Sequence, residues 1–165
     1  MVKVTYAITV CNELMEITRL INFLHPRIQS DDEILIQYDE EGVTTQVLDY
    51  LTIISELHPN IRVIGFPLNK DFASYKNNLK NHAEGLFIFQ IDADELPSEY
   101  LVANLHDFLD ANLDIDLYFV PRVNTVEGLT NEHIQKWRWN VNEKGWVNWP
   151  DVQTRLYRRT SEIEW

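Results

Sequence analysis

Hydrophobic and polar positions follow two alternating patterns along residues 4–120. Short apolar runs rich in β-branched residues predict strands. These runs are residues 4–10, 34–38, 61–64, 86–91 and 117–120. Between them, apolar residues recur every three or four positions, which is typical of helices with one buried face. The predicted helices are residues 14–24, 44–57, 71–83 and 97–109.

Strand and helix therefore alternate four times, which predicts an α/β fold with a mostly parallel sheet and helices on both faces. Asn12 is the expected cap of the first helix, and Pro97 is expected in the first turn of the fourth. Gly85 is expected at the C-terminal cap of the third helix, in which Phe72 is expected to point inward. In such sheets, ligands bind beyond the carboxyl ends of the strands.

The C-terminal third has a different character. It contains all five tryptophans: Trp137, Trp139, Trp146, Trp149 and Trp165. The pattern predicts a short helix over residues 131–137, an irregular loop and a strand over residues 154–157. No repeat, low-complexity tract or linker separates this part from the rest. We expect one domain over residues 1–165, with an α/β part at 1–123 and an irregular Trp-rich appendage at 124–165.

Composition narrows the class of partner. The 165 residues suffice for one hydrophobic core, and 45% hydrophobic residues are ordinary for a globular protein. With 14 Lys and Arg against 26 Asp and Glu, the formal net charge is -12. Nucleic-acid binding needs a basic surface, so we expect none. A small phosphorylated ligand remains compatible with this charge if a cation accompanies it.

The single cysteine, Cys11, excludes an internal disulfide and a thiolate zinc cluster. The first residues lack the apolar region of a signal peptide. No apolar run approaches the ~20 residues of a membrane-spanning helix. These features predict a cytoplasmic protein without a transmembrane segment.

The segment GLFIFQIDADELP, residues 85–97, combines an apolar strand with three carboxylates at its end, Asp92, Asp94 and Glu95. Because such close negative charges repel, we expect a positive group beside them. Alternate residues leaving a strand can aim two carboxylates into one crevice, where hard oxygen ligands suit Mg²⁺ or Mn²⁺. Alternatively, these acids only favour the dipole of the helix that follows Pro97.

Two other metal-dependent motifs fit the acidic segment less well. An EF-hand loop requires a glycine and a distal glutamate at fixed offsets, and both are absent. An aspartyl phosphatase motif usually lies on the first strand and has Thr or Val where Leu96 stands.

Further polar residues lie at the predicted strand ends. Asp39 could accept a hydrogen bond from a nucleobase, or could belong to a solvated acidic turn. Lys76 could reach a phosphate, although an exposed helical lysine is the commoner case. The tryptophans could stack on sugar rings, but core packing or a protein interface is the more common use. The five histidines show no spacing of metal ligands.

Three segments together resemble the family 2 glycosyltransferases of the GT-A fold, which are nucleotide-diphospho-sugar transferases. ITVCNE, residues 8–13, is similar to the family's first-strand segment, which often reads Pro-Thr-Tyr-Asn-Glu. NKDFASYKNNLKNHAEGLFIFQIDADE, residues 69–95, resembles the segment that leads into the family's D-x-D motif. GWVNWPDVQTRLYRR, residues 145–159, is similar to a block of the branch that adds sugars to lipopolysaccharide core.

The resemblance implies a role for each matching residue. Donor-binding residues would be Thr9, Asn12, Glu13, Asp39, Lys76 and Asp92. Thr9 and Asp39 would contact the base, commonly uracil. Asp92 would face the ribose and the metal, and Asp94 would ligate the Mn²⁺ or Mg²⁺ ion. Asp151 would be the base that deprotonates the acceptor hydroxyl.

The implied reaction is transfer from a UDP-sugar to a glycan or a lipid-linked sugar, with inversion in one displacement. The appendage at 124–165 would then lie on the acceptor side, and a homo-oligomer is possible. Cys11 departs from the aromatic residue that often stacks on the base, and Glu40-Glu41-Gly42 departs from the common continuation after Asp39. The metal-binding His-Glu pair usual beyond this point does not occur before Trp165, so we expect a fragment or an incomplete metal shell.

Two alternative functions remain. A non-catalytic nucleotide-sugar-binding or assembly module would keep the donor site without turnover. A nucleotidyltransferase of related fold would need a glycine-rich, arginine-containing loop after the first strand. The segment TVCNELME, residues 9–16, has neither residue, which disfavours that class.

Overall fold

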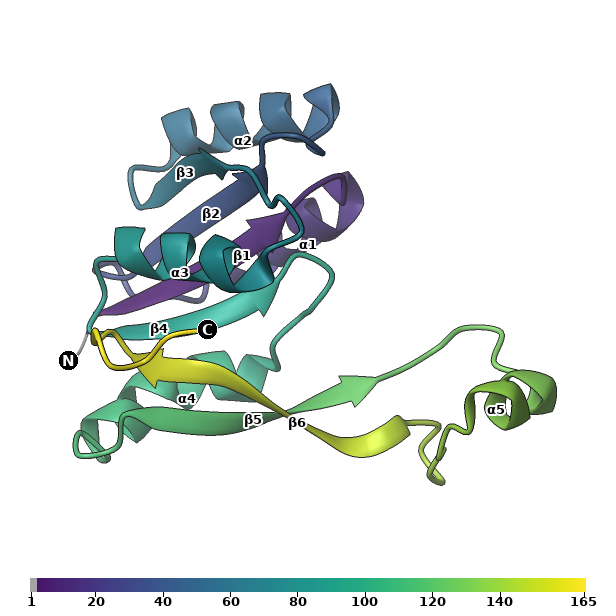
Figure 1. Ribbon diagram of the computed structural model, residues 1–165. Coiled ribbons are helices and arrows are strands. Elements are labelled where there is room, and N and C mark those ends of the chain that lie inside the picture. The colour runs from purple at the N-terminus through teal and green to yellow at the C-terminus, as the bar shows by residue number, and fades with distance from the viewer. Residues whose placement is uncertain (1–2) are drawn as a thin grey trace.

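The computed structural model describes residues 3–165 and contains one six-stranded sheet of order β3-β2-β1-β4-β6-β5 (Figure 1). The strands are β1 Val4–Val10, β2 Glu33–Asp39, β3 Ile61–Phe66, β4 Phe87–Asp92, β5 Leu117–Asn124 and β6 Val147–Arg158. Strands β1 to β4 are parallel, β6 is antiparallel to β4, and β5 is antiparallel to β6. The α/β fold with a mostly parallel sheet is confirmed.

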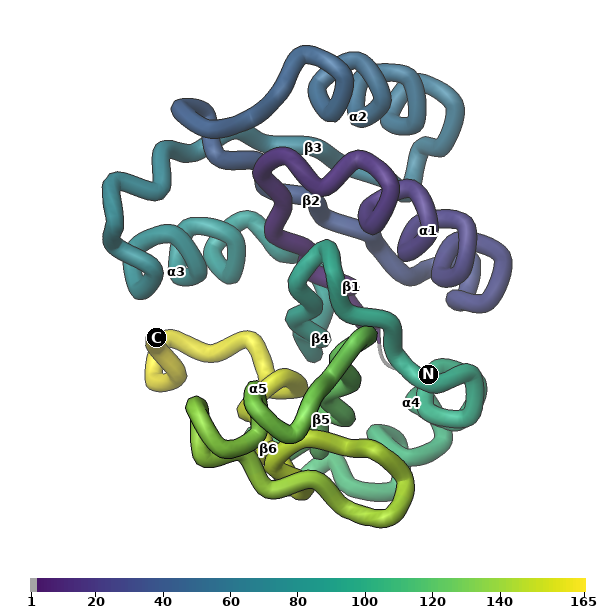
Figure 2. Tube along the Cα trace, turned by 90° about the vertical axis from the view of Figure 1, so that its right-hand side faces the viewer, coloured from purple at the N-terminus to yellow at the C-terminus, as the bar shows by residue number. Residues whose placement is uncertain are grey.

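Helices cover both faces of this sheet, as predicted. They are α1 Leu14–Leu24, α2 Thr45–Leu57, α3 Phe72–His82 and α4 Glu99–Asp110. The fifth helix, α5 Asn131–Trp137, has no buried residue and does not cover the sheet. Residues of α1, α2 and α4 form the larger buried cluster with one face of the sheet. Residues of α3 and Ile163 pack on the opposite face. Figure 2 shows α3 on the side of the sheet opposite α1 and α4. Within residues 3–165, no helix has the length and apolarity that crossing a membrane requires.

The central strands β1, β2 and β4 are mostly apolar and buried along most of their length, because both of their faces are covered. On β1, Tyr6 and Ile8 face the larger cluster, whereas Ala7 faces the smaller one beneath Leu79 of α3. All four side chains are fully buried. Tight burial of both faces fixes the strand register, and with it the positions of the residues at the carboxyl ends of the strands.

The structure corrects several predicted helix ends. Glu13, rather than Asn12, is the N-cap residue of α1. Ser98 caps α4 by accepting a hydrogen bond from the Leu101 amide, so the helix begins after Pro97. On α3, Phe72 is 63% exposed, and Tyr75 takes the inward position instead.

Gly85 does not cap α3, which ends before Ala83. A Cβ atom on Gly85 would lie 2.5 Å from the backbone nitrogen of Thr5 and 2.8 Å from the backbone oxygen of Phe87. The Gly85 amide also donates to the Thr5 hydroxyl. Glycine is therefore needed here because the chain passes directly against β1 as it enters β4.

The C-terminal third contributes more to the sheet than predicted. Strand β6 begins at Val147, well before the predicted residue 154, and lies between β4 and β5. Residues 125–146, here called the arm, connect β5 to β6 and carry α5 away from the body (Figure 1). The division expected at residue 123 therefore separates the arm from the body but not β6 from the sheet.

Replacing Gly85 with alanine is expected to destabilise the fold by about 1–3 kcal/mol, the range typical of overpacking. The new methyl group would press on the backbone of β1, which has no room to move between β2 and β4. Urea denaturation would measure the free energy of unfolding. Asn81→Ala, at an exposed position of α3, is the control and is expected to stay within about 0.5 kcal/mol of the parent. Equal stability of the two variants would contradict the packing argument.

Candidate functional site

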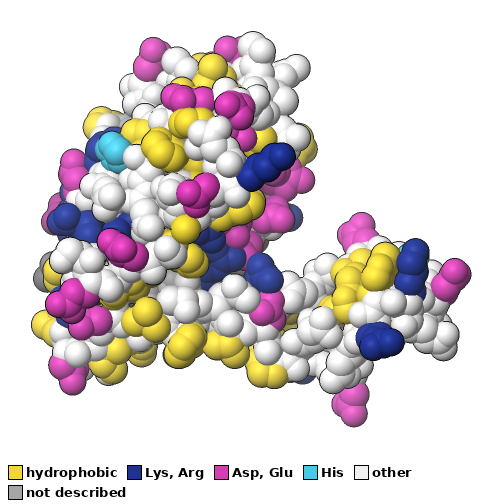
Figure 3. Space-filling view, viewed as in Figure 1, with side chains coloured by type: hydrophobic (Ala, Val, Ile, Leu, Met, Phe, Trp, Pro, Cys, Tyr) yellow, Lys and Arg dark blue, Asp and Glu magenta, His cyan; other side chains and the backbone are white. Residues whose placement is uncertain are grey.

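A split in the sheet creates a cleft next to the acidic segment. Strands β4 and β6 pair only from Phe87–Arg158 to Phe89–Leu156. Beyond Phe89, β4 stays paired with β1 as far as Asp92, while β6 stays paired with β5. A cleft of about 990 Å³ lies between them and is visible as the hollow between body and arm (Figure 3). It opens at the carboxyl end of β4, where ligands of such sheets bind.

Asp92 ends β4 with both carboxylate oxygens occupied. Its Oδ1 accepts from the Thr9 hydroxyl at 3.0 Å, and its Oδ2 accepts from Arg155 Nη2 at 2.8 Å. Burial acts to raise the pKa of Asp92, but the hydrogen bond and charge of Arg155, with help from Lys76 and Thr9, outweigh burial and leave the pKa below its ordinary value. Asp92 is therefore held as a carboxylate of fixed orientation.

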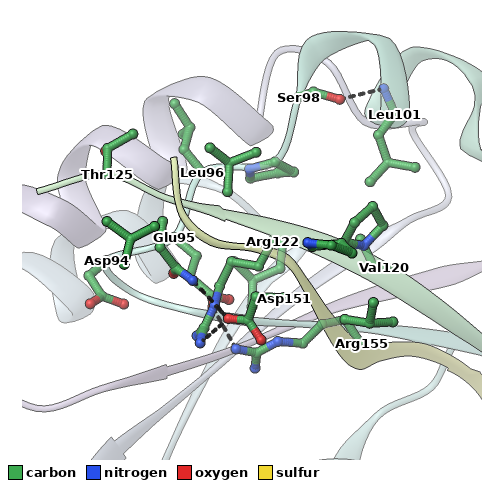
Figure 4. Close-up of a pocket in the computed structure, with 18 of the residues that line it drawn as sticks. Asp94, Glu95, Leu96, Ser98, Leu101, Val120, Arg122, Thr125, Asp151 and Arg155 are labelled. Carbon is green, nitrogen blue, oxygen red and sulfur yellow. Dashed lines mark hydrogen bonds and ion pairs between the residues drawn. The ribbon is translucent and has the colours of Figure 1, made fainter. Parts of the chain in front are cut away.

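Glu95 joins both sides of the cleft. Its Oε1 accepts from Arg155 Nη2 at 2.5 Å and from Arg122 Nη1 at 3.1 Å, and its Oε2 accepts from the Asp92 amide at 3.2 Å (Figure 4). Arg155 comes from β6 and Arg122 from β5. The positive charge expected beside the acidic segment is thus supplied by two arginines from the opposite side of the split.

Asp151 lies on the far wall of the cleft with three side-chain donors around it. Its Oδ2 accepts from Arg122 Nε at 2.8 Å and from Asn124 Nδ2 at 2.9 Å, and its Oδ1 accepts from Gln153 Nε2 at 2.6 Å. Hydrogen bonds from Asn124, Arg122 and Gln153 lower the pKa of Asp151 to about 2. A general base works best with a pKa near the operating pH, so these contacts suit an anchor for Arg122 better than the predicted base.

Asp94 differs from the other acids of the cleft. Its side chain is exposed, lines the cleft and makes no hydrogen bond or ion pair with any residue in the described range 3–165 (Figure 4). Across that same range, no three His, Cys, Asp or Glu residues come together as a metal site. One free carboxylate nevertheless fits Mg²⁺ or Mn²⁺, because such ions take one or two carboxylates and complete their shell with substrate phosphates and water.

The residues expected to contact the nucleobase lie at the ends of β1 and β2. Asp39 Oδ1 accepts from the Leu68 amide at 3.0 Å. A Cβ atom on Gly42 would lie 2.6 Å from Cys11 Sγ and 2.8 Å from Asp39 Oδ2, so this loop packs closely on both residues. The Glu13 carboxylate accepts from the Cys11 amide at 2.8 Å. Asp39, Cys11 and Glu13 thus form one polar corner at the carboxyl ends of β1 and β2.

Two other residues were predicted to bind the sugar donor. Lys76 lies close enough to Asp92 for their charges to interact, whereas the Asn12 side chain points into solvent. Lys76 Nζ lies 4.3 Å from the ring centroid of Trp165. Burial lowers the pKa of Lys76, and nearby Asp92 counteracts that effect. The Asn12 side chain is exposed and makes no hydrogen bond within the described part of the chain, while its amide donates to Glu13.

Sequence reasoning missed Glu95, Arg122 and Arg155 as site residues. A signal existed, because three carboxylates in four positions demand a counter-charge, and Arg155 lies in the RLYRR segment that carries part of the resemblance. What the sequence alone does not give is the antiparallel position of β6, which brings that arginine to the end of β4.

Comparison with known proteins agrees with this geometry. The family model described as glycosyl transferase family 2 matches residues 5–160. No curated protein matches the chain.

Among solved structures, the chain is similar to a mannosyltransferase, PcManGT from Pyrobaculum calidifontis, in complex with GDP-Man and Mn²⁺. The identity is 21% and the TM-score 0.59, over 72% of this chain and 35% of that one. It is also similar to S. aureus TarS 1-349 in complex with UDP-GlcNAc, with 18% identity and a TM-score of 0.60, over 79% of this chain and 36% of that one.

The similarity to S. aureus TarS itself has 18% identity and a TM-score of 0.63, over 96% of this chain and 28% of that one. At these identities, the likeness supports the shared fold. The chain spans about a third of the length of these structures.

The Asp151 carboxyl group is expected to stay ionised far below the usual range for aspartate, because three donors stabilise its charged form. Its ¹³C carboxyl resonance should not titrate between about pH 7 and pH 4, since an ordinary aspartate titrates near pH 3.9. A lowered pKa in the folded state means that this stabilisation is present above the unfolded pKa and is lost as the pH falls towards 2. In Asn124→Ala, the midpoint should rise. A parent midpoint near 4 would contradict the hydrogen-bonded arrangement.

Proposed function

The chain belongs to glycosyl transferase family 2, and we propose that it transfers a sugar from a nucleotide-diphosphate donor to a hydroxyl acceptor with inversion. The observation that carries the proposal is the Asp92-Ala93-Asp94 segment at the end of β4. One carboxylate, Asp92, is fixed by Thr9 and Arg155, and the other, Asp94, faces the cleft without a protein partner.

The donor would lie across the carboxyl ends of β2, β1 and β4. The corner around Asp39 would receive the base, and Thr9 with Asp92 would receive the ribose. Lys76 would attract the diphosphate. Asp94 would hold an Mn²⁺ or Mg²⁺ ion, which would neutralise the charge that develops on the departing diphosphate. Structures of similar fold with GDP-Man and Mn²⁺ or with UDP-GlcNAc support this class of donor. A UDP-sugar is our preferred donor.

The acceptor would enter from the arm side of the cleft, where Trp139 and Asn148 are among the lining residues. Its hydroxyl oxygen would bond to the anomeric carbon as the bond from that carbon to the diphosphate oxygen breaks. The nucleoside diphosphate leaves, and the hydroxyl proton passes to a base. A glycan or a lipid-linked sugar would suit this indole- and amide-lined entrance, because sugar C–H groups pack on aromatic faces.

A nucleotide-sugar-binding module without turnover is the second candidate. One observation favours it: Asp151, the residue expected to act as base, is engaged by three donors and has a pKa of about 2. The two candidates share the donor site and differ only in whether transfer follows.

We expect UDP to bind in a metal-dependent manner, since Asp94 offers a carboxylate to an ion that the diphosphate also ligates. Calorimetry with and without Mn²⁺ would measure the dissociation constant. Asp94→Asn should remove the effect of Mn²⁺, whereas Asp107→Asn, at an exposed position of α4, should not. Failure of the parent to bind either UDP or GDP in the presence of Mn²⁺ would refute the donor site.

Transfer is expected to fall at least about 100-fold in Asp94→Asn, because metal-ion stabilisation of a leaving group contributes several kcal/mol. The measurement is release of UDP from a panel of UDP-sugars, with and without added glycan acceptors, by the parent, the variant and Asp107→Asn. Metal-dependent UDP binding without release above background for any donor would favour the binding module instead.

A further inference from the structure

The two halves of the cleft are joined by side chains where backbone pairing stops. The last paired residues of β4 and β6 are Phe89 and Leu156, and the next residue of β6 is Arg155. From there, a series of alternating charges crosses the split. We call this series the charge ladder: Asp92, Arg155, Glu95, Arg122 and Asp151.

Each step of the ladder is a close ion pair. Arg155 Nη2 lies 2.8 Å from Asp92 Oδ2 and 2.5 Å from Glu95 Oε1. Arg122 Nη1 lies 3.1 Å from the same Glu95 oxygen, and Arg122 Nη2 lies 2.7 Å from Asp151 Oδ2. Arg155 is only 7% exposed. The two ion pairs of Arg155 are therefore screened less than surface pairs, and removing one partner leaves the other uncompensated. The Arg122 side chain is 40% exposed, so its two pairs are screened more.

Glu95 occupies the centre of the ladder and also shapes the backbone of the acidic segment. Its carboxylate accepts from the Asp92 amide at 3.2 Å, and its own amide donates to the Asp92 carbonyl at 2.9 Å. The turn that carries Asp94 is therefore closed at both ends by Glu95 and Asp92. Through Arg155, the same glutamate also fixes the direction of the Asp92 carboxylate.

We propose that Glu95, with Arg155 and Arg122, positions the donor-binding carboxylates and couples them to the acceptor wall of the cleft. The proposal rests on the proposed function, because it assigns these three residues to the donor site. None of them needs to touch the donor. They set the distance between the turn at residues 92–95 and the strand pair β5–β6 that carries Asp151.

The experiment measures UDP binding with Mn²⁺ at 25 °C, on folded protein, together with the unfolding temperature. Glu95→Gln keeps the shape of the side chain and removes its charge. The UDP dissociation constant should rise about tenfold, the lower end of the loss typical when a residue supporting a metal ligand is changed. Glu95→Asp keeps the charge and should recover part of the affinity.

The matched control is Glu84→Gln at the opposite end of β4. Glu84 also contacts two cations, Lys3 at 2.9 Å and Arg62 at 3.0 Å, but lies away from the cleft. Its substitution should leave the UDP dissociation constant within about twofold of the parent, as expected for a distant independent site. If the loss of any ion-paired glutamate weakened UDP binding, Glu84→Gln and Glu95→Gln would raise the dissociation constant equally.

Arg122→Gln tests coupling across the cleft and serves if Glu95→Gln does not fold. Arg122 does not contact Asp92 or Asp94, so a purely local role would leave UDP affinity unchanged. The ladder instead requires weaker UDP binding, by about threefold or more. The double variant Glu95→Gln with Arg122→Gln should bind UDP no more than about twofold more weakly than Glu95→Gln, because the ladder is already cut at its centre.

The outcomes separate the two proposals. Parent protein that binds UDP with Mn²⁺, while Glu95→Gln and Arg122→Gln stay within about twofold of it, would overturn the positioning role and leave the proposed function standing. Parent protein that binds neither UDP nor GDP would overturn both. Weaker binding in the two ladder variants, with Glu84→Gln unchanged, is the result expected.

Discussion

The compensation of three carboxylates by two guanidinium groups is the interaction on which the site depends. Asp92 ends β4, Glu95 follows the turn after it, and Asp151 comes from β6. Without counter-charges, the carboxylates of Asp92 and Glu95 would repel each other. The repulsion would be stronger than in water, because both groups are partly buried. Arg155 and Arg122 reverse that situation by turning repulsion into a chain of ion pairs. The split between β4 and β6 can therefore stay open as a cleft while its walls remain fixed.

Much of the fold could be predicted because local periodicity carries it. The parallel strands β1 to β4 and the helices between them follow directly from apolar runs and helical spacing. Strand β6 could not be placed in the same way, because its position depends on pairing with β4, some 70 residues earlier in the chain. The predicted N-cap of α1 was also wrong by one residue, and the predicted start of α4 was wrong by two. Each helix start has polar residues side by side, and the backbone geometry decides that Glu13 and Ser98 are the N-cap residues.

The sequence predicts those parts of the candidate site whose residues are close together in the chain. It does not predict contacts between residues that are distant in the chain and meet only in the folded protein. Asp92 and Asp94 lie close together because Asp92 ends β4 and Asp94 follows two residues later in the turn, which is a local property of the sequence. The contacts of Asp151 come instead from Arg122 and Asn124 on the neighbouring strand and from Gln153 on its own. Those contacts lower the pKa of Asp151 and tie its carboxylate to Arg122. No pattern within the segment around Asp151 contains that information.

The acidic residues of the cleft differ in whether a positively charged side chain of the protein contacts them. Asp94, Glu95 and Asp151 all line the cleft. Glu95 and Asp151 have their charges compensated by arginines, so a divalent cation there would have to displace a guanidinium group. Asp94 has no such partner in residues 3–165, and its side chain is open to the solvent of the cleft. The ladder thus neutralises the acids that hold the walls together, and it leaves the Asp94 carboxylate free for the cation of the proposed donor site.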